Sequence, residues 1–332
     1  MTIGIPMADF SLHSVQRWSD AERSVTSGSK RNLFNLNTHG MAQFNIYEEI
    51  TNRILAEIDN GIIPWHKPWT CSAGAVSHTN GRPYSLLNQI LLGVDVMGEV
   101  PEYREYLTLK QVNAEGGKVK KGEKSKWVVF WKMYQKERIK DDGEKVIDTI
   151  PLLKYYHVFE VGQCEGIIRK WEPLERKSLV PVEEAENIIS AYFNRETCKL
   201  RICESDKACY SPLFDTVTAP QMTQFGVVGE YYSTLFHEMV HSTGHKSRLN
   251  RFEDGSYFGS EAYSKEELVA EMGAAFLIGK VGIDTQSVFR NSVAYLQGWS
   301  RKLREDKYLF VSAAGKAEAA VKYIINGKEE TK

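Results

Sequence analysis

Hydrophobic residues recur at helical spacing near the start of the folded part of the chain. In the segment 44–58 they fall every three or four positions, which predicts a helix ending at Asn60-Gly61, before Pro64. A second helix is expected over 86–97, and a short third helix in LTLKQVNAEGG should end at the two glycines. The aromatic and β-branched runs VKKGEKSKWVVFWKMYQK and LLKYYHVFEV predict strands, with a hairpin turn at Asp142-Gly143.

A stretch with two prolines and mixed charge, KWEPLERKSLVPVEE, predicts a linker in the middle of the chain. After it we expect a helix over 182–194, short strands in KLRICES and ACYSPLFDTVT, and helices up to the C-terminus. The pattern therefore predicts an α+β protein with two domains, 43–175 and 181–328, each with its own core. Residues 1–42 have few periodic apolar positions and predict a flexible N-terminal extension.

The composition restricts the class of protein. With 332 residues and 42% hydrophobic content, the chain is long enough for two cores, and its net charge of −1 gives no overall attraction to nucleic acid. It has no apolar run of about 18 residues and no secretory signal pattern at its start, so we expect a cytoplasmic protein without a membrane partner. Its five cysteines include no C-x-x-C pair, which argues against a disulfide framework or a zinc ribbon.

The segment HEMVHSTGHKSR, residues 237–248, contains the pattern H-E-x-x-H. Residues four apart share one face of a helix, so His237 and His241 could bind the same ion. In H-E-x-x-H sites the ion is zinc and the glutamate, here Glu238, is the general base for the attacking water. The structural alternative is a chance occurrence of this short pattern on an amphipathic helix.

A third ligand is expected from the later helix SKEELVAEMGAAFLIGK, where Glu267 and Glu271 lie on one face. Ser264 and Glu267 fit a capping box, and small residues around Glu271 would allow close helix approach, so we favour Glu271. The reverse assignment stays open, because some zincins with a glutamate ligand place a supporting carboxylate four residues after it. Tyr263 is a candidate oxyanion donor, and 208–218 is the candidate edge strand of the cleft.

The longer metzincin signature H-E-x-x-H-x-x-G-x-x-H does not fit the chain. Its third histidine would fall on Ser247, whereas the nearby histidine is His245, directly after Gly244. We therefore expect His245 to lie outside the set of metal ligands.

The first half also carries a basic and aromatic stretch between 104 and 140. Lysines that neutralise phosphates, combined with aromatic rings on which bases stack, are typical of proteins that bind single strands. The alternative is that the tryptophans alternate into a core while the lysines protect a sheet edge. The candidate DNA-binding residues here and in the earlier stretches PWHKPW and TNGRPYSLL are Trp65, Lys67, Trp69, Arg82, Tyr84, Lys118, Lys120, Lys121, Lys124, Lys126, Trp127 and Trp131.

From Phe44 onward the chain resembles the ArdC antirestriction proteins of conjugative plasmids. The resemblance rests on ILAEIDNGIIPWHKPW, TNGRPYSLLNQILL, KKGEKSKWVVFWK, YYHVFEV, FHEMVHSTGHKSRLNR and GSEAYSKEELVAEMGAAFL. It implies an N-terminal single-stranded-DNA-binding domain, also found at the start of some plasmid primases, and a C-terminal zincin-like metallopeptidase domain. It further implies a protein of mobile genetic elements that protects incoming plasmid or phage DNA against host restriction.

Two hypotheses follow for the function. In the first, the chain binds single-stranded DNA and is a peptidase that uses Zn²⁺, or another divalent ion such as Mn²⁺, on a host restriction component or another protein. In the second, it is a non-catalytic DNA-binding or inhibitor protein with a structural metal. A structural site has no use for a general base, so the role of Glu238 distinguishes them.

Overall fold

The computed structural model describes residues 45–66, 74–93, 103–139, 145–171, 181–252, 261–283 and 293–328. The N-terminal extension 1–42, the hairpin turn at Asp142-Gly143 and most of the expected linker lie outside the described residues. Among the helices described, none is long and apolar enough to cross a bilayer.

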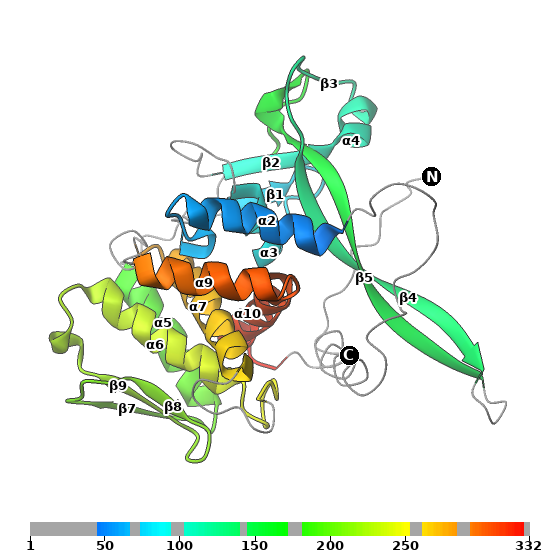
Figure 1. The fold of residues 1–332 in the computed structure, drawn as a ribbon. Helices are drawn as coiled ribbons and strands as arrows, with labels where there is room; N and C mark the ends of the chain where they lie inside the picture. Colours follow the sequence, from blue (N-terminus) through cyan, green and yellow to red (C-terminus); the bar gives the residue numbers. More distant parts are fainter. Residues whose placement is uncertain are drawn as a thin grey trace.

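The first half of the chain forms a four-stranded sheet with helices beside it (Figure 1). The sheet order is β1 (Gly74–Ser77), β2 (Tyr103–Thr108), β5 (Lys145–Glu160) and β4 (Lys126–Ile139), and only the β1–β2 pair is parallel. The three predicted helices are present as α2 (Ile46–Asp59), α3 (Leu86–Gly93) and α4 (Leu109–Ala114). The short elements are η1 (Pro64–His66), β3 (Lys118–Val119), η2 (Val161–Gln163) and β6 (Cys164–Glu165).

Local sequence explains the start of α2. The Asn45 side chain accepts hydrogen bonds from the backbone N–H groups of Tyr47 and Glu48, which would otherwise have no partner inside the helix. The isoleucines at the predicted spacing are buried along one face of the helix, so the apolar periodicity does mark the side that packs.

The second half places a helical layer on a small sheet. The sheet order is β7 (Lys199–Cys203), β9 (Thr216–Pro220) and β8 (Cys209–Ser211), which makes β8 an edge strand inside the range 208–218. The helix α6 (Val228–Thr243) contacts β8 and β9. The other elements are α5 (Pro181–Arg195), η3 (Met222–Gln224), α7 (Glu261–Val281), α9 (Val293–Glu305) and α10 (Leu309–Asn326).

The α+β class is confirmed, but the expectation of separate cores is wrong, because one cluster of buried residues runs through both halves. Trp65 is 1% exposed and its ring lies 6.1 Å from Trp299 and 5.8 Å from Phe310. The Thr51 hydroxyl donates to the Lys307 carbonyl at 2.9 Å, and Glu318 accepts from the first N–H of α3 at 3.0 Å. The helices α2 and α3 contact the sheet, and they also contact helices of the second half, α2 with α9 and α10, and α3 with α10.

Candidate functional site

The helix α6 brings the two histidines of the H-E-x-x-H pattern together. Their Nε2 atoms lie 3.1 Å apart and their rings are nearly perpendicular, with centroids 4.7 Å apart. The apolar residues around them, including Phe236, Met239 and Val240, are fully buried and fix the rotation of the helix. His237 and His241 therefore face the same space from consecutive turns.

The helix α7 contributes Glu267 to the histidine pair. Its carboxylate oxygens lie 3.5 Å from His237 Nε2 and 3.3 Å from His241 Nε2. The potential ligand atoms of these three residues lie within 4.8 Å of one another. Among the described residues, this is the one cluster of His, Cys, Asp or Glu side chains that could hold a metal ion. Glu271 is not part of this group, so the geometry favours the alternative that the sequence left open, with Glu267 as the third ligand.

Close helix packing explains this arrangement. A Cβ atom on Gly273 would lie only 2.7 Å from Val240 Cγ2, so the absence of a side chain lets α7 press against α6. Gly273, one of the small residues near Glu271, therefore allows α7 to approach α6 closely, as the sequence predicts. Glu267 lies six residues before this contact and reaches the histidines.

The three side chains fit a divalent ion. Ligand distances of 2.0–2.2 Å in tetrahedral geometry imply ligand–ligand separations of about 3.3–3.6 Å. The two Nε2 atoms are 3.1 Å apart, slightly less than this range, and each lies 3.3–3.5 Å from a different oxygen of Glu267, so the three groups are close enough to share one ion. Two imidazoles and a carboxylate are also a donor set that zinc and several other divalent ions accept.

Glu266, which the sequence analysis did not single out, contacts the other nitrogen of His241. Its Oε1 lies 3.5 Å from His241 Nδ1, and its two oxygens accept from Arg251 Nη2 at 2.6 Å and Nε at 3.2 Å. Arg251 also donates to Thr243 Oγ1 at 2.6 Å and to the Val240 carbonyl at 2.8 Å. A carboxylate on Nδ1 favours the tautomer that leaves Nε2 free to bind an ion.

The carboxylates around His241 favour a positive charge at this position. Burial opposes ionisation of His241, but hydrogen bonds with Glu266 and Glu267 raise its pKa to about 10. Burial likewise disfavours the charged form of Glu266, but the charge of Arg251 and the hydrogen bond with His241 lower its pKa to about 2. A bound cation would therefore replace a proton at His241.

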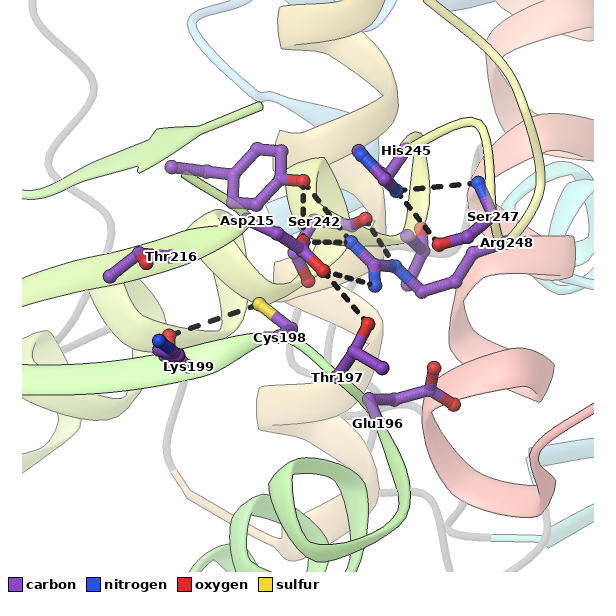
Figure 2. Close-up of polar contacts among 12 residues, drawn as sticks. Glu196, Thr197, Cys198, Lys199, Asp215, Thr216, Ser242, His245, Ser247 and Arg248 are labelled. Atoms are coloured by element: carbon purple, nitrogen blue, oxygen red, sulfur yellow. Dashed lines mark hydrogen bonds and ion pairs between the residues drawn. The ribbon is translucent and has the colours of Figure 1, made fainter. Parts of the chain in front are cut away.

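A second polar network, centred on Arg248, contacts the C-terminal end of α6 (Figure 2). Arg248 donates to the Ser242 carbonyl at 2.7 Å, to the Asp215 carboxylate at 3.1 Å and to the Tyr210 hydroxyl at 3.1 Å. The Tyr192 and Ser242 hydroxyls are 2.7 Å apart, which links α5 to α6. Burial raises the pKa of Asp215, but its hydrogen bonds from Arg248 and Tyr210 outweigh this and keep it below its ordinary value.

Three further residues considered for the peptidase site, Glu238, Tyr263 and His245, are not among the clustered ligands. Glu238 is 9% exposed on α6, and its charge contributes to the raised pKa of His241. Tyr263 belongs to α7, but its side chain lies outside the described residues. His245 Nδ1 contacts Ser247 Oγ at 2.8 Å, and neither residue belongs to the ligand group.

The candidate DNA-binding residues separate into exposed, packed and undescribed positions. Trp65 was expected to contact DNA, but this expectation is wrong. The residue is buried against Trp299 and Phe310, so its ring offers no face to a base. Lys67 and Trp69 lie outside the described residues. Half-buried positions are Tyr84, Lys126, Trp127 and Trp131, and exposed positions are Arg82, Lys118, Lys120, Lys121 and Lys124.

Comparisons with known families agree with both halves of this architecture. Residues 44–159 match the N-terminal domain of anti-restriction factor ArdC, and residues 184–316 match a zincin-like metallopeptidase. The fold and the candidate site thus define a two-part protein with an ArdC-type N-terminal domain and a zincin-like metallopeptidase domain.

The similarity extends to solved structures. Crystal structures of the antirestriction protein ArdC from plasmid R388, metal-free and Mn(II)-bound, align with TM-scores of 0.66 and 0.67. Each is 32% identical and covers 87% of this chain and 100% of that chain. This chain belongs to the ArdC antirestriction family.

Curated relatives include two Escherichia coli proteins named DNA primase TraC, which are 31% and 30% identical over 84% of this chain. The chain spans only 27% and 20% of their lengths. An uncharacterized protein of Sinorhizobium fredii is 28% identical, and the match covers 82% of this chain and 89% of that protein.

The two glutamates of α7 can be separated by metal binding. We expect Glu267→Ala to abolish stoichiometric binding of zinc or manganese, because it removes one of the three clustered ligands. Glu271→Ala should leave stoichiometric binding intact. Equilibrium dialysis with elemental analysis measures both, and full occupancy in Glu267→Ala would refute the assignment.

Glu266 gives a second prediction. Glu266→Gln should weaken metal binding about 10- to 100-fold, since it loses the carboxylate that orients His241. Competition with a chromophoric chelator measures the affinity, and Glu305→Gln, at an exposed position of α9, is the matched control. An unchanged affinity in Glu266→Gln would contradict the orienting role.

Proposed function

We propose that this chain is an antirestriction protein that binds single-stranded DNA through its N-terminal half and carries a metal-dependent peptidase site. The observation that carries the peptidase part is the His237, His241 and Glu267 group, with separations that suit one divalent ion and a glutamate next to the first histidine. The similarity to antirestriction protein ArdC of plasmid R388 supports a role in protecting incoming plasmid or phage DNA.

The residues of the site have distinct roles in this proposal. His237, His241 and Glu267 would hold the ion, which supplies Lewis-acid polarisation of a peptide carbonyl when bound. Glu238 accepts the proton of the attacking water and later transfers it to the leaving amine. Glu266 and Arg251 keep His241 in the required tautomer and orientation.

Zinc is the ion that we propose first, because a histidine–histidine–glutamate set is a known catalytic zinc site. Manganese is the second candidate, and the Mn(II)-bound structure of the plasmid R388 protein supports it. The donor set accepts either ion, so availability would decide which one is bound.

The DNA-binding part of the proposal rests on charge and relatedness. Lys118, Lys120, Lys121 and Lys124 are exposed within one short segment around β3, although Lys120 also donates to the Gly162 carbonyl at 2.7 Å. Such a cluster supplies the phosphate neutralisation that binding to a single strand needs. Two relatives are named DNA primases, which supports a nucleic-acid ligand for the shared region.

Glu238 tests whether the site is catalytic. We expect Glu238→Gln to keep its metal, because Glu238 is not one of the clustered ligands, and to lose about 10²- to 10⁴-fold in hydrolysis rate. Cleavage of unfolded protein substrates by the zinc-loaded and manganese-loaded chain would measure this, with His245→Gln as the control. If the wild-type chain cleaves nothing and Glu238→Gln protects DNA as well as wild type, the non-catalytic alternative is correct.

Salt dependence tests the DNA part. For binding of the full chain to a single-stranded oligonucleotide, the logarithm of the association constant should fall by about 0.7 per unit of log salt concentration for each phosphate contact. Lys121→Gln should flatten this slope by about one contact, whereas Lys199→Gln, on the exposed side of β7, should not. Fluorescence anisotropy across a salt series measures the slopes, and equal slopes for both variants would exclude Lys121 from the interface.

A further inference from the structure

The hairpin of β4 and β5 has two faces with different surroundings. Pairing is antiparallel, with Val128 opposite Tyr156, Val129 opposite Tyr155 and Phe130 opposite Lys154. Successive residues of a strand point to opposite sides, so Tyr155 and Tyr156 lie on different faces. Figure 1 shows the two strands extending beyond α2 and α3.

The first face, which carries Trp127, Trp131 and Tyr155, is partly occupied by α2. The Arg53 guanidinium lies 4.0 Å from the centre of the Trp127 ring, and Arg53 is also 3.7 Å from Glu49. Trp127 and Trp131 pack against the main core. The protein itself therefore covers much of the aromatic surface on this side.

On the second face Val128 and Val158 are buried in a cluster with Leu92 of α3, and Phe130 and Tyr84 pack against this cluster. The same face also carries Lys132, Lys154 and Tyr156. The Phe130 ring lies 5.6 Å from Tyr156 and 6.5 Å from Tyr84, so the three rings form one group. Tyr156 is 44% exposed, and it is a diagonal neighbour of Phe130 across the strands.

The charge on this second face is positive. Lys154 stands directly opposite Phe130, and Lys132 is two residues further along the same strand and face. Both lysines are exposed, and neither forms an ion pair with another described residue. The paired positions of this face from 126 to 132 and from 152 to 158 contain no acidic residue.

We propose that the bases of single-stranded DNA stack on Phe130, Tyr156 and Tyr84, while Lys132 and Lys154 neutralise the adjacent phosphates. This assignment rests on the proposed binding of single-stranded DNA and names the surface that performs it. The exposed Tyr156 ring, with the half-buried Phe130 and Tyr84 rings beside it and the two exposed lysines nearby, offers both stacking and phosphate contacts. The Trp127 face, which α2 crowds, is not the stacking surface.

Adjacent tyrosines provide a matched pair of variants for the test. Tyr156→Thr and Tyr155→Thr each remove one ring, at 44% and 40% exposure, and threonine keeps the preference for a strand. In the full chain, Tyr156→Thr should weaken binding to a single-stranded oligonucleotide by about 5- to 150-fold. Tyr155→Thr should change it by less than about twofold, since its ring lies on the other face.

An abasic oligonucleotide of equal length separates stacking from charge. The loss in Tyr156→Thr should vanish on the abasic strand, because no base is present to stack. Lys154→Gln should weaken binding to both strands and flatten the salt slope by about 0.7. Circular dichroism melting of each variant verifies that the hairpin is folded.

Each outcome is decisive. Losses confined to Tyr155→Thr, equal losses in both tyrosine variants, or wild-type affinity in Tyr156→Thr and Lys154→Gln overturn the assignment while the proposed DNA binding stands. An absence of oligonucleotide binding by the wild-type chain at low salt overturns the proposed DNA binding itself, and the assignment with it.

Discussion

The candidate metal site depends on the close approach of α6 and α7. Gly273 has no side chain, so Val240 can occupy the space where a Cβ atom would lie, and the two helices meet there. This approach brings Glu266 to Nδ1 and Glu267 to Nε2 of the same imidazole, that of His241. Like charges this close require compensation, which Arg251 supplies on one side. On the opposite side, the two Nε2 atoms and Glu267 bring three potential ligand atoms within 4.8 Å of one another, an arrangement that suits a divalent cation.

The two halves of the chain are joined by more than a linker. Trp65 lies against Trp299 and Phe310, and Glu318 of α10 accepts from the first N–H group of α3. Separating the halves would expose these buried rings, at about 25 cal/mol per Å² of apolar surface, and would leave the α3 terminus without its carboxylate. The shared core therefore fixes the hairpin, which we propose as a DNA surface, relative to the helices that carry the candidate metal ligands.

Sequence periodicity predicted α2, α3, α5 and the shared helix face of His237 and His241, because these features depend on neighbours within one helix. It could not choose between Glu267 and Glu271, since both lie on one face of α7 and their distances to the histidines of α6 depend on tertiary packing. It gave no indication that Trp65 is covered by a segment more than 230 residues away. Alternation of the tryptophans in β4 into a core was one of two alternatives, and the sequence did not show that α2 would cover Trp127. In each case the deciding contact comes from a distant part of the chain.

X-ray absorption spectroscopy of the full chain loaded with zinc tests the central claim most directly, because it reports the ligands without requiring a substrate. The account predicts two imidazole nitrogens at about 2.0–2.1 Å and carboxylate oxygen at about 2.0–2.2 Å, with no sulfur scatterer. A first shell that contains thiolate sulfur at about 2.3 Å, or only oxygen ligands without the multiple-scattering pattern of imidazole, would contradict the site that α6 and α7 form.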